Sequence, residues 1–151
     1  DNYATAVGEA QNLQAQLKAI GVNLDLQQMP TSPYVKAWLD ADFDAAVARN
    51  GGSSDPYSMY GRYFTTDGSL KGPAGLASKT LNDLLVKGNS TADETVRQAT
   101  YQQLQEELLK ESPWVWLFAE YDYYLVSDKL SGFTARADES LIHLAGASLS
   151  S

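Results

Sequence analysis

The stretch 7-VGEAQNLQAQLKAIGVNLDLQQM-29 decides the fold that the sequence predicts. Its apolar residues recur at three- and four-residue spacing as far as Ile20, and Gly21 then acts as a stop. This spacing predicts a helix over residues 3–20. From Val22 onward apolar and polar residues alternate, which is the period of a strand with one buried face. A helix that leads directly into a strand is typical of α/β proteins.

The same order of elements recurs further along the chain. A short helix is predicted over residues 33–41, with Pro33 in its first turn, and the alternating segment 43-FDAAV-47 follows it. The aromatic, β-rich segment 114-WVWLFAEYDYYLVS-127 predicts a third, longer strand. Because helices and strands alternate, the sequence predicts an α/β fold with an at least partly parallel sheet.

Three further helices are expected over residues 57–64, over residues 79–87, and from 91-TADE-94 to just before Pro113. Ser78 is placed to cap the second of these and Gly88 to close it, while Thr91 and Glu94 form the pattern of a capping box. The Gly-rich span 67–75 is predicted to be irregular.

Composition excludes several classes of function. A chain of 151 residues is the size of one ordinary domain, and its net charge of −8 with only scattered basic residues argues against binding to nucleic acid. The absence of cysteine excludes disulfides and thiolate metal sites, and no apolar stretch approaches the ~20 residues that span a bilayer. Since the chain begins without Met, we expect it to be a fragment of a longer protein.

No pattern of residues predicts an active site, a metal or a cofactor. His143 is the only histidine and has no second ligand at metal-binding spacing, so a structural or surface role is expected. The acidic groups at 40–44 and at 120–122 could suggest acid–base catalysis, but alternating acids on a strand usually mark its solvated face. No Walker loop and no nucleophile-elbow motif occurs.

Four segments, in order, resemble one family. They are 13-LQAQLKAIGVNLDLQQMP-30, 34-YVKAWLDADFDAAVARNGG-52, 75-GLASKTLNDLLVKG-88 and 101-YQQLQEELLKESPWVWLFAEYDYYLVSDKLSGF-133. Together they are similar to the C-terminal portion of the family-5 extracytoplasmic solute-binding proteins of ABC importers. Ser78 stands where the family usually has asparagine, and Trp116 where it has proline.

The resemblance implies a fold and a function. It implies the second lobe of a type II periplasmic-binding-protein-like fold, a mixed sheet flanked by helices, over residues 1–127, with residues 128–151 returning toward a first lobe. It implies an extracytoplasmic protein without enzymatic activity or cofactor, which captures a peptide-like ligand between two lobes and delivers it to ABC permease subunits. Contact with a membrane is expected only through the permease or a lipid anchor.

The resemblance also places a ligand-binding edge in the loop after residue 48. In peptide-binding relatives this loop reads A-R-x-G-W-x-A-D-Y, and its Asp takes the amino terminus of the peptide. One match puts Asp55 at that anchor, and a shorter loop puts Ser53 or Ser54 there; neither match supplies the tryptophan. The residues expected at the ligand are Arg49, Asn50, Gly51, Gly52, Ser53, Ser54, Asp55 and Tyr57.

Several interpretations stay open at the level of sequence. Asp55 before Pro56 is also a turn signal, and the tyrosines at 57, 60 and 63 are spaced to pack into a core. Within the same family an oligosaccharide is the alternative ligand, because aromatic faces with hydroxyl and amide groups suit a sugar. A hydrolase that uses paired carboxylates is the remaining alternative.

Overall fold

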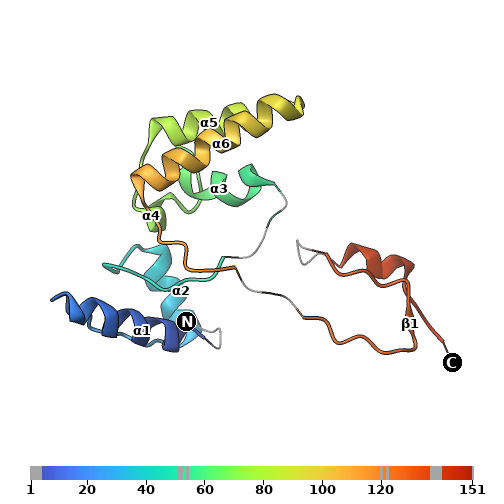
Figure 1. Ribbon diagram of the computed structural model, residues 1–151, viewed down its shortest axis with the longest axis horizontal. Coiled ribbons are helices and arrows are strands. Elements are labelled where there is room, and N and C mark those ends of the chain that lie inside the picture. The colour runs from blue at the N-terminus through green and yellow to red at the C-terminus, as the bar shows by residue number, and fades with distance from the viewer. Residues whose placement is uncertain are drawn as a thin grey trace.

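The computed structural model describes residues 5–50, 53, 55–119, 121, 123–136 and 141–150, and within these it is mostly helical (Figure 1). The helices of this described part are α1 (Ala6–Ala19), α2 (Thr31–Leu39), α3 (Pro56–Phe64), α4 (Lys71–Ala74), α5 (Lys79–Asn89), α6 (Glu94–Glu111) and the 3₁₀ helix η1 (Ile142–Gly146). Two short strands, β1 (Leu130–Ser131) and β2 (Ser148–Leu149), pair antiparallel.

The core lies where α5 packs between α6 and α3. Leu81 and Leu85 of α5 are fully buried, and Leu104 and Leu108 of α6 are almost fully buried. Both helices place leucines four residues apart, so each presents one apolar stripe to its neighbour. Figure 1 shows α5 and α6 side by side above α3, with α4 at their lower end.

Gly88 shows how closely α5 and α6 approach. A Cβ atom at this position would lie 2.6 Å from the ring of Tyr101 on α6. Glycine therefore lets a buried tyrosine ring lie directly against the last turn of α5.

The starts of the three core helices follow from local sequence. Asp55, Ser78 and Asp93 each stand one residue before a helix, and each side chain accepts a hydrogen bond from a backbone N–H of the first turn. The predicted cap at Ser78 is therefore confirmed. The predicted capping box at 91–94 is wrong, because Asp93 caps α6 while the Thr91 hydroxyl accepts the Asp93 backbone N–H at 3.2 Å.

An aromatic layer extends the core toward α2. Trp114 lies 4.8 Å from Tyr63 and 5.0 Å from Phe64, measured between ring centroids, and Trp38 of α2 meets Tyr63 edge-on at 6.1 Å. Tyr60 also packs against Trp114, so the expectation that the tyrosine stripe of α3 packs into the core is confirmed.

The predicted mixed sheet of an α/β fold is wrong. In the described residues the only paired strands are β1 and β2, and the segments 22–29, 43–47 and 114–119 belong to no ladder. A strand needs a neighbouring backbone, and alternation of side chains does not supply one. Here side chains take that place: Gln14 donates to the Leu24 carbonyl and Tyr34 to the Val47 carbonyl.

Helix boundaries otherwise lie close to the predicted ones. The first two helices are shorter or shifted by about two residues, and α6 ends before Pro113 as expected. The prediction that the Gly-rich span 67–75 is irregular is wrong in part, because residues 71–74 form the single turn α4. Gly75 closes this turn with a left-handed φ of 65°.

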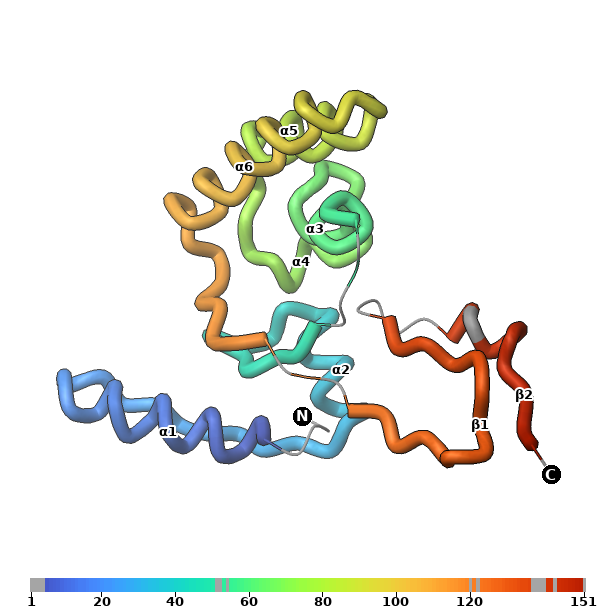
Figure 2. Tube along the Cα trace, turned by 45° about the vertical axis from the view of Figure 1, so that its right-hand side comes forward, coloured from blue at the N-terminus to red at the C-terminus, as the bar shows by residue number. Residues whose placement is uncertain are grey.

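Residues 123–136 and 141–150 lie apart from the helical body, with the β1–β2 pair at their far end (Figure 2). Side chains before this pair, such as Val115, Tyr121, Tyr123 and Leu125, are almost wholly exposed. No helix in the described ranges is both long and apolar enough to cross a membrane.

The core makes a direct prediction through two adjacent leucines of α6. Leu108 is 2% exposed and Leu109 is 66% exposed. Leu108→Ala should lower the free energy of unfolding by about 2–5 kcal/mol, since it leaves a cavity between α5 and α6, whereas Leu109→Ala should change it by less than about 1 kcal/mol. Urea unfolding of both variants checks this, and equal losses would contradict the packing.

Candidate functional site

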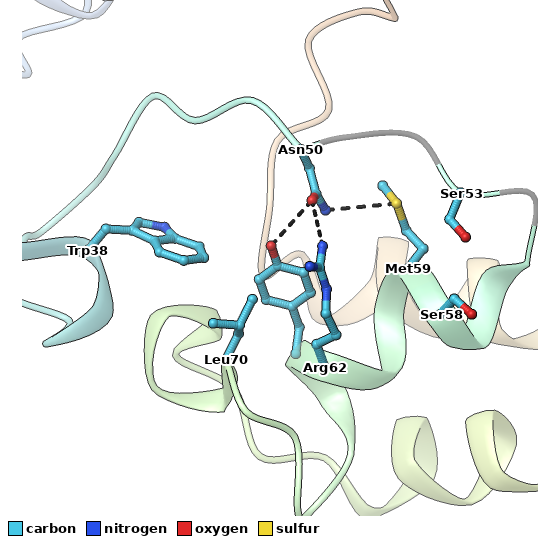
Figure 3. Close-up of a pocket in the computed structure, with 8 residues that line it drawn as sticks. Trp38, Asn50, Ser53, Ser58, Met59, Arg62 and Leu70 are labelled. Carbon is cyan, nitrogen blue, oxygen red and sulfur yellow. Dashed lines mark hydrogen bonds between the residues drawn. The ribbon is translucent and has the colours of Figure 1, made fainter. Parts of the chain in front are cut away.

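An open hollow of about 460 Å³ lies at the exposed side of α3, in the size range of small-ligand sites (Figure 3). Its lining comes from α2, the loop before α3, α3 itself and the residue before α4. The lining residues are Trp38, Asn50, Ser53, Ser58, Met59, Arg62, Tyr63 and Leu70.

Helix α3 builds the floor of the hollow by its periodicity. Asp55 and Pro56 fix where the helix begins, so Ser58 and Arg62 fall one turn apart on the same face. Tyr63, the next residue, borders this face and is buried in the core.

A glycine turn folds Leu70 back over the end of α3. The Leu70 backbone N–H donates to the Arg62 carbonyl at 2.8 Å. A Cβ atom on Gly68 would lie 2.4 Å from that same carbonyl oxygen, so only glycine permits this close return.

Asn50 is the polar centre of the hollow. Its Oδ1 accepts a hydrogen bond from Arg62 Nη2 at 2.9 Å and from the Tyr63 hydroxyl at 3.4 Å. Its Nδ2 lies 3.8 Å from the Met59 sulfur (Figure 3). One amide side chain thus holds the end of the loop against three residues of α3.

Burial raises the pKa of the Tyr63 hydroxyl, and the nearby Arg62 guanidinium opposes this with a smaller effect. Tyr63 therefore stays protonated at neutral pH and keeps its proton as a donor toward Asn50. The Arg62 guanidinium also lies 5.3 Å from the centre of the Tyr63 ring, a favourable cation–π distance.

Asp55 lies at the side of the hollow and is already engaged by protein groups. Its Oδ1 accepts the Ser58 backbone N–H at 2.9 Å, and its Oδ2 pairs with Arg97 Nη2 at 2.9 Å. Arg97 also donates to the Gly88 carbonyl at 2.8 Å and lies over the Tyr101 ring. This arginine thus ties the start of α3 to the end of α5 and to α6.

Partial burial of Asp55 would by itself raise the pKa of its carboxyl group. The hydrogen bonds from Ser58 and Arg97, together with the Arg97 charge, outweigh that effect and lower the pKa below its ordinary value of 3.8. Asp55 is therefore ionised at neutral pH, and its charge is compensated within the protein.

The structure brings only some of the predicted ligand residues together. Asn50 and Ser53 line the hollow. Arg49 is exposed beside it, Asp55 caps α3, and Tyr57 packs against the core. The predicted residues Gly51, Gly52 and Ser54 lie outside the described residues.

Arg62, Ser58 and Trp38 also line the hollow, although none of them was predicted as a ligand residue. Trp38 contacts Tyr63 in the aromatic layer and also lines the hollow. The spacing of Ser58 and Arg62 behind the cap at Asp55 was a usable signal, because a helix that begins at Pro56 must place both on one face.

The acidic residues offer no alternative centre within the described ranges. Lys36 pairs with Asp40, and no group of three or more His, Asp or Glu residues there could hold a metal ion. Glu120 and Asp122 and the side chain of His143 lie outside the described residues.

Comparison with known proteins adds no relative: no protein-family model matches this chain, and no curated protein sequence matches it either. The resemblance to solute-binding proteins therefore depends on the four sequence segments alone.

A double-mutant cycle tests the link between Asp55 and Arg97. Asp55→Ala and Arg97→Ala should each lower the free energy of unfolding by about 1–2 kcal/mol, and their combination should cost about 0.5 kcal/mol or more less than the sum. The pairing of Ser78→Ala with Arg97→Ala is the control and should be additive, because Ser78 caps the opposite end of α5. Additive losses for the Asp55 pair would contradict the contact.

The lowered pKa of Asp55 also predicts a dependence on pH. Asp55→Asn keeps a capping oxygen but removes the charge, so wild type should be the more stable protein at pH 5. Its advantage is fully present above 3.8, the unfolded pKa, and should be lost as pH falls through the lower folded pKa. Urea unfolding of both proteins from pH 5 to pH 2 measures it; a constant difference would contradict the assignment.

Proposed function

We propose that this chain is the ligand-binding part of an extracytoplasmic solute-binding component of an ABC importer, which captures a small polar organic solute without chemical change. The observation that carries the proposal is the open hollow beside the loop at which the sequence resemblance predicts the ligand. Asn50 and Ser53 belong both to the predicted set and to the lining.

The chemistry of the lining supports reversible binding. Trp38 offers an aromatic surface, while Asn50, Ser53 and Ser58 offer amide and hydroxyl groups. Ligand sites combine such apolar surface with a few placed polar groups. The described lining holds no acid–base pair and no activated nucleophile, so a hydrolase is disfavoured.

The state of Asp55 favours the alternative ligand class, an oligosaccharide, over a peptide anchored by its ammonium group. The Asp55 carboxylate already caps α3 and pairs with Arg97, so an incoming ammonium would have to displace an internal charge partner. Sugar hydroxyls need no such exchange, since amide and hydroxyl side chains with aromatic faces suffice. Permease subunits are the partners that this function requires.

Titration of the ¹⁵N-labelled chain with maltotriose and with trialanine tests the proposal. Maltotriose should shift the indole N–H resonance of Trp38 and the side-chain amide of Asn50, and the indole of Trp116 should serve as the internal control outside the hollow. The sugar should be recovered unchanged. Hydrolysis, or the absence of any shift at Trp38 with either solute, would contradict the proposed function.

A further inference from the structure

The hollow contains one charged side chain, Arg62, and none of its lining residues is acidic. This local excess of positive charge occurs in a chain whose net charge is −8. Arg97 on α6 has its charge compensated by Asp55 at 2.9 Å. Within the described ranges Arg62 has no such carboxylate partner: its contacts are the neutral amide of Asn50 and the Tyr63 ring.

The contacts of Arg62 orient its guanidinium group and leave most of its N–H donors without a hydrogen-bond partner in the described residues. Of the five N–H donors of an arginine, one is bound to Asn50 Oδ1, and the ring of Tyr63 supports one side of the plane. The side chain is exposed and lines the hollow, so the remaining donors are accessible to a solute (Figure 3). An arginine held in this way is preorganised for a planar acceptor.

We propose that Arg62 binds a carboxylate of the transported solute, so that the oligosaccharide favoured above is a monoanionic, acidic one; this inference depends on the proposed function of the hollow. A planar carboxylate can accept two parallel N–H bonds from the guanidinium fork. The Ser58 hydroxyl lies in the same lining and can donate to one of the remaining lone pairs, whereas the Ser53 hydroxyl already donates to the Asp55 carbonyl at 3.2 Å.

The balance of charge selects a carboxylate over other charged groups. A ligand ammonium would meet Arg62 with the same sign of charge, which costs free energy. A phosphate dianion is best compensated by several cations or by a cluster of backbone N–H groups, and the lining supplies one cation. A single negative charge matches the single guanidinium.

Three probes of one skeleton test the inference: N-acetyl-L-phenylalanine, its neutral amide, and L-phenylalanine amide, which carries an ammonium group. We expect the acid to shift the Arg62 Nε–H and Trp38 indole resonances with an affinity about tenfold or more above that of the neutral amide, since a charge-assisted hydrogen bond is gained. The ammonium probe should bind most weakly. Inorganic phosphate is titrated alongside and should bind more weakly than the acid.

Arg62→Gln should remove the preference for the acid and keep weak binding of the neutral amide, because glutamine can still donate to Asn50. Lys87→Gln is the matched control: it removes one positive charge from the exposed face of α5, outside the hollow, and should leave the preference unchanged. Arg62→Lys keeps the charge without the fork and should retain part of the preference. Circular dichroism of each variant confirms that the helices are intact.

Each failure points to a different error. Equal affinity for the acid and the neutral amide, or an unchanged preference in Arg62→Gln, would overturn the inference and leave the proposed function standing. Tighter binding of phosphate would replace the carboxylate with a phosphoryl group. If none of the probes and neither maltotriose nor trialanine shifts Trp38, the hollow binds no solute and both proposals are wrong.

Discussion

The contact between α5 and α6 is the constraint on which the placement of α3 and of the hollow depends. Four leucines close this interface, and Gly88 lets the ring of Tyr101 lie against the last turn of α5. Helix α3 packs on α5, so its register relative to the hollow is set from the core outward. Arg97 adds a polar link at the same place, because it joins the start of α3 to the end of α5. The floor of the proposed ligand site is thus held by both apolar and charged contacts.

Local signals were sufficient to predict the helices and insufficient to predict the sheet. A cap such as Ser78 and a stop such as Pro113 act within a few residues, so the sequence contains the whole interaction. A strand is different, because its hydrogen bonds reach a backbone that can be far away in the chain. The alternation at 22–29 and at 43–47 says which side chains could share a face, but it cannot supply the neighbouring strand.

In the candidate site, too, features set by neighbouring residues could be predicted, whereas contacts between residues far apart in the sequence could not. Asn50 and Ser53 were expected at the ligand because of the resemblance to solute-binding proteins, and both line the hollow. Arg62 could not be predicted as their partner without the helix that returns it to Asn50, twelve residues earlier. Asp55 carried two signals, a turn and a ligand anchor; the described contacts fit the turn signal, since the cap and Arg97 use both carboxylate oxygens.

The exposed side chains around Val115, Tyr123 and Leu125 have a consequence for the colloidal behaviour of the chain. An extended segment has unpaired backbone N–H and C=O groups, and apolar side chains on it favour contact with other chains. Such a segment is a template on which other chains can add by edge pairing. At neutral pH the charge of −8 makes copies repel one another before such contacts can form. Near the isoelectric point of about 4.4 that repulsion disappears while the apolar surface is unchanged. Acidic surface charge is therefore the barrier between this segment and self-association.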